Sequence, residues 1–142
     1  MRIFFEKWTF LLITVHIYSM INTMQKYHSQ LGIPKNVQTR FGQILLEYSQ
    51  HALEESQKDR YGRIRNLPKS LDTQQATIVE VVVQNGKTVK AVYETPYTKL
   101  HKLSLVILPA NRKVVTLWLS EISDKHQTLN ESAYCIPDEE EL

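Results

Sequence analysis

The stretch that decides the fold is "TIVEVVVQNGKTVKAVYETP", residues 77–96. Two runs rich in β-branched residues flank the dipeptide Asn85-Gly86. This dipeptide favours the two-residue type I′ turn of a β-hairpin, because both of its residues tolerate a positive φ. The stretch therefore predicts two antiparallel strands joined by a tight turn.

A two-residue loop also predicts which residues of the hairpin face each other. The expected pairs are Gln84 with Lys87, Val82 with Val89, Glu80 with Ala91, and Ile78 with Tyr93. The alternate side chains then share the other face of the hairpin; they are Val79, Val81, Val83, Thr88, Lys90 and Val92. Four valines mark that face as the core face, with Lys90 as its one charged member.

Two more strands follow the hairpin. "KLSLVILP", residues 102–109, and "KVVTLWLS", residues 113–120, are apolar on both faces, as central strands covered on each side tend to be. Residues 110–112 are short enough to join them as a second antiparallel hairpin. Thr116 is polar but β-branched, so it can fill a strand position.

Upstream of the strands, the apolar residues recur at helical spacing. Asn36 can cap a helix whose body runs from Val37 to about Lys58. Its apolar stripe consists of Phe41, Ile44, Leu45, Tyr48 and Ala52. The expected fold class is therefore α+β, with N-terminal helices packed on an antiparallel sheet of about four strands.

The N-terminal segment, "MRIFFEKWTFLLITVHIYSMINT", looks like a signal peptide at first sight. Glu6, His16 and the lack of an A-x-A-like cleavage site count against export, and the apolar run is too interrupted for a membrane span. Three interpretations stay open: an amphipathic helix, a translation start at Met20 or Met24, and membrane attachment through residues 3–21. The expected divisions are an apolar segment at 1–24, a single α+β domain at 25–136 and an acidic tail at 137–142.

Composition places the chain among ordinary globular proteins, with 42% hydrophobic and 23% charged residues. Cys135 is the only cysteine and cannot form an internal disulfide, so a reducing, cytoplasmic setting is expected. A basic stretch at residues 58–69 contains Lys58, Arg60, Arg63, Arg65 and Lys69. Such a stretch fits either a phosphate-binding surface or a solvated helix end and loop.

Several kinds of site are missing from the sequence. It has no glycine-rich nucleotide loop, no G-x-S-x-G, no H-E-x-x-H and no cysteine and histidine cluster at zinc spacing, so neither a cofactor nor a metal is expected. The remaining inventory of His, Lys, Arg, Thr and Tyr suits metal-independent cleavage of RNA. Histidine transfers protons near neutral pH, and cations stabilise the charge on phosphate.

Two segments resemble a known group of domains. "YSQHALEESQKDRYG", residues 48–62, resembles the S-x-H-A…R opening of small toxin-like domains that share the barnase/RelE/EndoU-type ribonuclease fold. "VVTLWLSEISDKHQTLNESAY", residues 114–134, is similar to the D-x-H-x-T-L-x-x-S-x-Y block of phage and toxin-associated proteins. The resemblance implies a helix packed on a curved antiparallel sheet, with an RNA-cleaving site on the concave face. The chain departs from the usual opening at Glu55 and Ser56, where a basic residue often stands.

The residues expected to act follow from the resemblance and from the basic stretch. The catalytic candidates are His51, Thr116, His126 and Tyr134, and the phosphate-binding or RNA-binding candidates are Arg60, Arg63, Arg65, Lys90 and Thr128. RNA and a cognate inhibitor protein are the expected partners. The alternative is a non-enzymatic phage or accessory interaction protein that uses the same fold as a scaffold.

Overall fold

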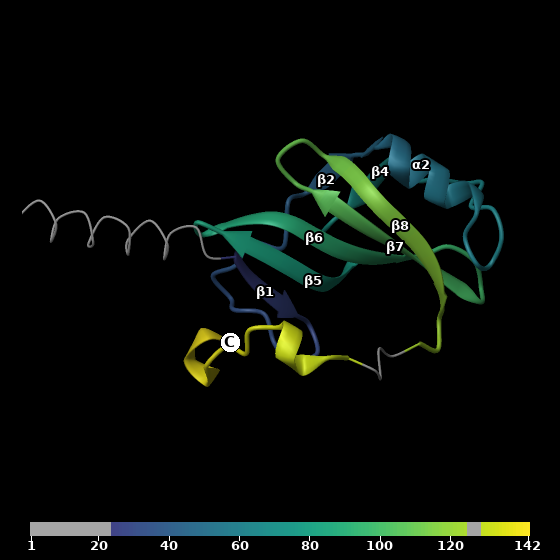
Figure 1. Ribbon diagram of the computed structural model, residues 1–142. Coiled ribbons are helices and arrows are strands. Elements are labelled where there is room, and N and C mark those ends of the chain that lie inside the picture. The colour runs from purple at the N-terminus through teal and green to yellow at the C-terminus, as the bar shows by residue number, and fades with distance from the viewer. Residues whose placement is uncertain (1–23, 125–128) are drawn as a thin grey trace, which may run out of the picture.

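The computed structural model describes residues 24–124 and 129–142, and most of its regular structure is β (Figure 1). In chain order the elements are β1 (Met24–His28), β2 (Gln43–Leu45), β3 (Glu47–Tyr48), α2 (Gln50–Gln57), β4 (Ser70–Asp72), β5 (Thr77–Gln84), β6 (Lys87–Pro96), β7 (His101–Leu108), β8 (Lys113–Glu121) and the 3₁₀ helices η1 (Glu131–Ala133) and η2 (Glu139–Glu141).

The strands form one large sheet and one small ribbon. The six-stranded sheet has the order β1-β5-β6-β7-β8-β3, and β2 pairs with β4 in a separate two-stranded ribbon. Neighbouring strands of the large sheet are antiparallel except for β3, which runs parallel to β8. The predicted α+β class with N-terminal helices on four antiparallel strands is therefore wrong. The structure is mainly β, with 42% strand and 12% helical residues, and α2 is the one α-helix of the described chain.

Most of the helix predicted over residues 37–58 is extended chain. Gly42 has φ +70°, a left-handed conformation that interrupts a helix. Thr73 holds the backbone around it, because its Oγ1 accepts from Phe41 N at 2.8 Å and donates to Gly42 O at 2.7 Å. Ile44 is buried whereas Leu45 is 65% exposed, which is the alternation of a strand and not the stripe of a helix.

The helix begins only after Ser49. Its side chain accepts a hydrogen bond from Ala52 N at 3.0 Å, which is the usual N-cap contact. Ala52 then packs into the core, whereas its neighbour Leu53 is partly exposed. The short helix that results places His51 and Glu55 one turn apart.

The hairpin of β5 and β6 is confirmed, but its register is more complex than a simple ladder. Asn85 and Gly86 both have positive φ, and Gln84 pairs with Lys87 as expected. The register then shifts by one residue, so that Val82 faces Lys90 instead of Val89. It shifts back near the start of β5, and the predicted pairing of Ile78 with Tyr93 holds.

The two register shifts redistribute the predicted core valines. An extra residue in a strand reverses the face of the side chains beyond it. Val81 and Val83 lie in the main core, whereas Val79 and Val92 belong to a small cluster on the opposite face of the sheet. Lys90 also leaves the predicted core face, because it alternates with the buried Ala91.

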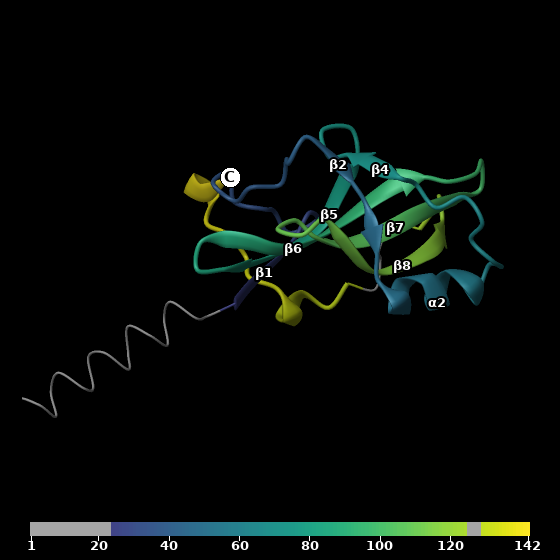
Figure 2. The same cartoon turned by 90° about the horizontal axis from the view of Figure 1, so that it is seen from above.

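The large sheet therefore has two different faces. The covered face carries the main core and packs under Ala52 of α2, Ile64 and Leu71 of β4. Figure 2 shows the β2–β4 ribbon along one side of the sheet and α2 beside β8. The other face, here called the groove face, carries the cluster of Val79, Val92 and Val106.

A third irregularity places Thr116 on the groove face. Val106 pairs with Thr116 and Ile107 pairs with Val114, so Val115 is an extra residue of β8. Residues directly opposite each other share a face, and Thr116 therefore lies on the same face as Val106. Val115 packs against that cluster too.

The outer edge of β8 is closed by residues on either side of α2. Ser49 N donates to Val114 O at 2.9 Å, and Ser49 Oγ donates to Val115 O at 3.3 Å. Further along, Leu119 N donates to Asp59 Oδ1 at 3.1 Å. These contacts occupy backbone groups that an open edge strand would offer to another chain.

The C-terminal segment lies along β1, at the other edge of the sheet (Figure 1). Cys135 N donates to Lys26 O at 2.7 Å, and Lys35 N donates to Glu141 O at 2.8 Å. Among the described residues no helix has the length and apolar character that crossing a membrane requires. The three interpretations of the N-terminal segment concern residues outside the described part of the chain.

Candidate functional site

Glu55 brings two of the predicted catalytic residues together. His51 Nε2 lies 2.9 Å from Glu55 Oε1, one turn along α2. Thr116, on β8, donates a hydrogen bond from Oγ1 to the same carboxylate oxygen. The sequence predicts His51 and Thr116 as site residues, whereas Glu55 stands out there only as a departure from the family pattern. The i, i+4 spacing between His51 and Glu55 is the sequence signal that would identify Glu55 as a partner of the histidine.

The contact with Glu55 decides which ring nitrogen of His51 is available for chemistry. A carboxylate accepts hydrogen bonds, so the nitrogen that faces it, Nε2, carries the proton. In the neutral ring Nδ1 then holds the lone pair; a catalytic triad works in the same way but with the two ring nitrogens exchanged. The side chain of His51 is 71% exposed, so Nδ1 is open to a ligand.

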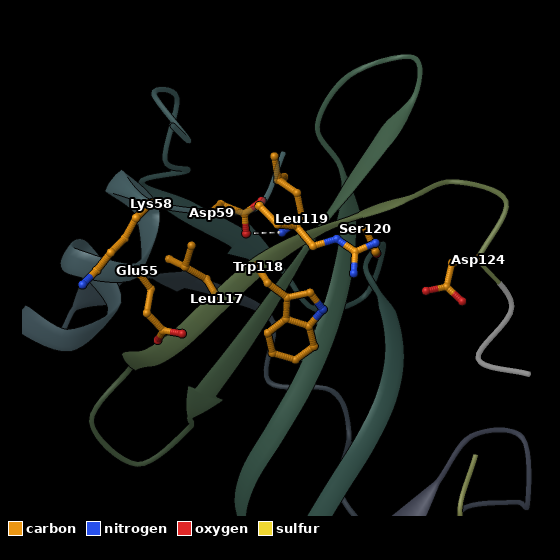
Figure 3. Close-up of a pocket in the computed structure, with 9 residues that line it drawn as sticks. Glu55, Lys58, Asp59, Leu117, Trp118, Leu119, Ser120 and Asp124 are labelled. Carbon is orange, nitrogen blue, oxygen red and sulfur yellow. Dashed lines mark hydrogen bonds between the residues drawn. The ribbon is translucent and has the colours of Figure 1, made fainter. Parts of the chain in front are cut away.

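A cavity of about 500 Å³ lies beside this cluster, between α2 and β8. Glu55, Lys58 and Asp59 line it from the helix side, and Trp118 and Ser120 line it from β8. In Figure 3 the indole of Trp118 lies between the carboxylates of Glu55 and Asp124. The predicted phosphate ligand Arg60 is a further member of the lining.

The acidic groups of this cavity already have partners within the protein. Asp59 accepts from Leu119 N with Oδ1 and from Tyr61 N with Oδ2, each at 3.1 Å. Glu55 accepts from Thr116 and His51. Lys58, in contrast, has no ion pair with the residues that the structure describes. A bound anion would therefore find an available ammonium group next to carboxylates whose charge is partly compensated.

A second cavity of about 330 Å³ lies on the other side of Trp118. Val79 and Val92 contribute its apolar lining, and Glu80 and Tyr134 contribute polar groups. Trp118 and Asp124 line both cavities. Together the two cavities, here called the groove, run across the groove face from α2 to the C-terminal segment.

Tyr134 lies at the far end of the groove. Its Oη donates to Glu80 Oε1 at 2.6 Å, and Lys26 Nζ lies 3.3 Å from the same oxygen. Burial and the bond to Glu80 raise the pKa of Tyr134 to about 12. Glu80 on β5 and Thr116 on β8 are three strands apart, which is roughly 14 Å. The structure therefore does not bring Tyr134 together with His51 and Thr116.

The other predicted residues fall in several places. Arg63 and Arg65 are exposed on either side of the buried Ile64, and Arg65 N donates to Tyr97 Oη at 3.1 Å. Lys90 is half-buried on the groove face. His126 and Thr128 lie outside the described residues, and their roles stay predictions.

No set of three or more His, Cys, Asp or Glu side chains within residues 24–124 and 129–142 is arranged to hold a metal ion.

Comparisons with known proteins add no relative. No family model matches the chain, and neither the curated proteins nor the solved structures contain a match. The likeness to toxin-type ribonucleases thus depends on the two sequence segments alone.

Proposed function

We propose that this protein binds single-stranded RNA in the groove and cleaves it without a metal ion, with His51 as the general base. The observation that carries the proposal is the contact of Thr116, Glu55 and His51 at the edge of a groove that contains an exposed tryptophan. The predicted histidine and hydroxyl are held by one carboxylate, beside a cavity of a size that admits a nucleotide.

The proposed reaction is attack of a ribose 2′-hydroxyl on the neighbouring phosphorus. Nδ1 of His51 takes the proton of the 2′-hydroxyl, and the 2′-oxygen bonds to phosphorus. The bond from phosphorus to the 5′-oxygen breaks, water protonates that oxygen, and the hydroxide that remains takes the proton from the His51 imidazolium. Glu55 stabilises the imidazolium ion that forms, which is the role of the carboxylate in a catalytic triad. Thr116 positions Glu55.

The cations of the cavity supply the electrostatic part of the proposal. Lys58 and Arg60 line it, and positive charge there stabilises the phosphorane that develops during the reaction. Trp118 offers a flat apolar surface on which a base can stack. The same features also suit binding without cleavage.

One observation favours the alternative of a non-catalytic interaction protein. The bonds from Ser49, Glu55 and Asp59 to β8 all tie the helical segment to the sheet. In that interpretation Glu55 is a structural link, and His51 is a surface partner of it.

The deciding experiment is a cleavage assay of the full-length chain on a single-stranded RNA. We expect products with a 2′,3′-cyclic phosphate and a 5′-hydroxyl, and no effect of EDTA. His51→Ala is expected to lower the rate about a hundredfold or more, the usual effect of losing a general base. Thr116→Val is expected to lower it about tenfold, through the lost bond to Glu55. Glu54→Gln, an exposed position next to Glu55, is the matched control and should leave the rate unchanged.

The assay separates the two functions. A wild-type chain that binds RNA but leaves it intact would support the non-catalytic alternative. Cleavage that is the same in wild type and His51→Ala would show that His51 is not the base. Circular dichroism of each variant checks that the fold is retained.

A further inference from the structure

Ser120 has a buried hydroxyl group with no partner among the described residues. It is 8% exposed, and its Oγ makes no hydrogen bond. Buried polar groups in proteins almost always have a partner, because leaving one unpaired costs free energy. Ser120 lines the cavity between α2 and β8, so a rotation of its side chain about χ1 would bring the buried hydroxyl to a molecule bound there.

Trp118 lies two residues before Ser120 on the same strand, and both face the groove. Its side chain is 39% exposed although it is the largest apolar group of the cavity. Figure 3 shows Trp118 projecting from β8 between Glu55 and Asp124. A flat aromatic surface beside an unpaired hydroxyl is suited to a flat ligand with a polar edge.

We infer that this cavity is a nucleobase subsite. One base of the bound RNA stacks on Trp118 and forms a hydrogen bond with Ser120 Oγ through its polar edge, while Lys58 and Arg60 contact the attached phosphate. This inference rests on the proposed function in that RNA is the ligand, but it concerns binding and does not require cleavage.

The charges of the cavity favour a nucleotide over a sugar, which also stacks on tryptophan. A neutral sugar gains no attraction between opposite charges from Lys58 and Arg60, and its hydroxyls donate their strongest hydrogen bonds to carboxylates. Both oxygens of Asp59 already accept backbone N–H groups, and Glu55 is bound to Thr116 and His51. Asp124 also lines the cavity, and beyond these carboxylates the cavity presents two cations, one hydroxyl and one indole.

The test uses the fluorescence of Trp118. The chain has two tryptophans, Trp8 and Trp118, so a Trp8→Phe chain reports on the cavity alone. Adenosine and uridine monophosphate should quench this fluorescence in a saturable way. Ribose 5-phosphate, which has the phosphate but no base, and glucose should leave it unchanged.

Variants then test the two contacts with a labelled single-stranded RNA, followed by anisotropy. Ser120→Ala should weaken binding about fivefold, the effect of one net hydrogen bond. Trp118→Leu should weaken it about tenfold or more, the effect of losing one stacked base, and Trp118→Phe should weaken it less. Ser123→Ala is the matched control, because Ser123 is exposed and lines a different hollow.

The outcomes distinguish this inference from the proposed cleavage. Nucleotide quenching by a chain that does not cut RNA would support the subsite and reject the cleavage. RNA cleavage with unchanged binding by Trp118→Leu, Trp118→Phe and Ser120→Ala would overturn the subsite and leave the cleavage standing. Quenching by glucose or ribose 5-phosphate to the same extent as by nucleotides would also overturn it.

Discussion

Tyr134 Oη donates a hydrogen bond of 2.6 Å to Glu80 Oε1, across 54 positions of the chain. Lys26 Nζ lies 3.3 Å from the same oxygen and 5.0 Å from the centre of the Tyr134 ring. These three residues join β1, β5 and the C-terminal segment. Their arrangement explains the position of Tyr134 by packing and not by a contact with His51.

We therefore expect Tyr134→Phe to affect stability and not cleavage. Losing the bond to Glu80 should lower the free energy of unfolding by about 1 kcal/mol, which urea denaturation would measure. The rate of RNA cleavage should stay within about twofold of wild type. Ser132→Ala, at an exposed neighbouring position, is the control. A hundredfold loss of the cleavage rate at an unchanged free energy of unfolding would instead show that Tyr134 acts in catalysis.

Asp59, two residues after the end of α2, should contribute to stability through both oxygens of its carboxylate. It accepts from Leu119 N at the edge of β8 and from Tyr61 N in the following loop. Asp59→Ala leaves both donors without this acceptor and should lower the free energy of unfolding by about 1–3 kcal/mol. Glu54→Ala, on the exposed face of α2, should change it by less than about 0.5 kcal/mol. Equal effects of the two substitutions would contradict this account of the β8 edge.

Alkaline pH should destabilise the fold through tyrosines whose pKa is raised, among them Tyr48, Tyr93 and Tyr134. Burial raises the pKa of Tyr48 and of Tyr93 from 10.0 to about 12, and burial with the bond to Glu80 does the same for Tyr134. Because these pKa values are higher in the folded than in the unfolded chain, the stability they contribute is complete below pH 10. It should then decrease as the pH rises from 10 to 12.

Two measurements follow this alkaline transition. Tyrosinate absorbance would report ionisation, and urea denaturation at each pH would report the free energy of unfolding. Tyr93→Phe removes one of the three groups and should make the decrease shallower. A free energy of unfolding that is constant or increasing between pH 10 and 12 would contradict the raised pKa values of these tyrosines.

Salt dependence should show whether the exposed arginines contact phosphate. If Arg63 and Arg65 each meet one phosphate of a single strand, the double substitution to alanine should lower the logarithmic salt slope of RNA binding by about 1.4. The control is Lys87→Ala with Lys99→Ala, which removes the same charge from two exposed positions elsewhere, one at the start of β6 and one in the loop after it. Equal salt slopes of RNA binding in the two double variants would show that Arg63 and Arg65 do not contact phosphate.

Local chemistry made part of this fold predictable from the sequence. Asn85 and Gly86 specify their turn because the required backbone conformation depends on those two residues alone. The long strands β7 and β8 follow for a similar reason, since their apolar runs are continuous and bounded by turn residues. His51 and Thr116 were identified as candidates by residue type and motif.

Long-range contacts decided the rest. Phe41, Ile44 and Leu45 have helical spacing, but Thr73 binds the backbone on both sides of Gly42 and Ile44 pairs with Leu71 of β4, so the segment is extended. No local pattern encodes those partners, about 30 residues away. The sequence does not predict strand β3 for the same reason, because its two residues pair with Lys113 and Val114 of β8, which lie far along the chain.

The candidate site, like the fold, was predictable from the sequence only in part. Residue type and the resemblance to a known motif marked His51 and Thr116, but an extra residue in β8 places Thr116 on the groove face, opposite Val106. That position brings its hydroxyl to Glu55 on α2, 61 positions away. A bulge depends on how two strands fit together over their whole length, and it reverses the face of every side chain beyond it. The sequence by itself therefore determined which side chains are available, and the packing of β8 against β7 and α2 decided which of them meet.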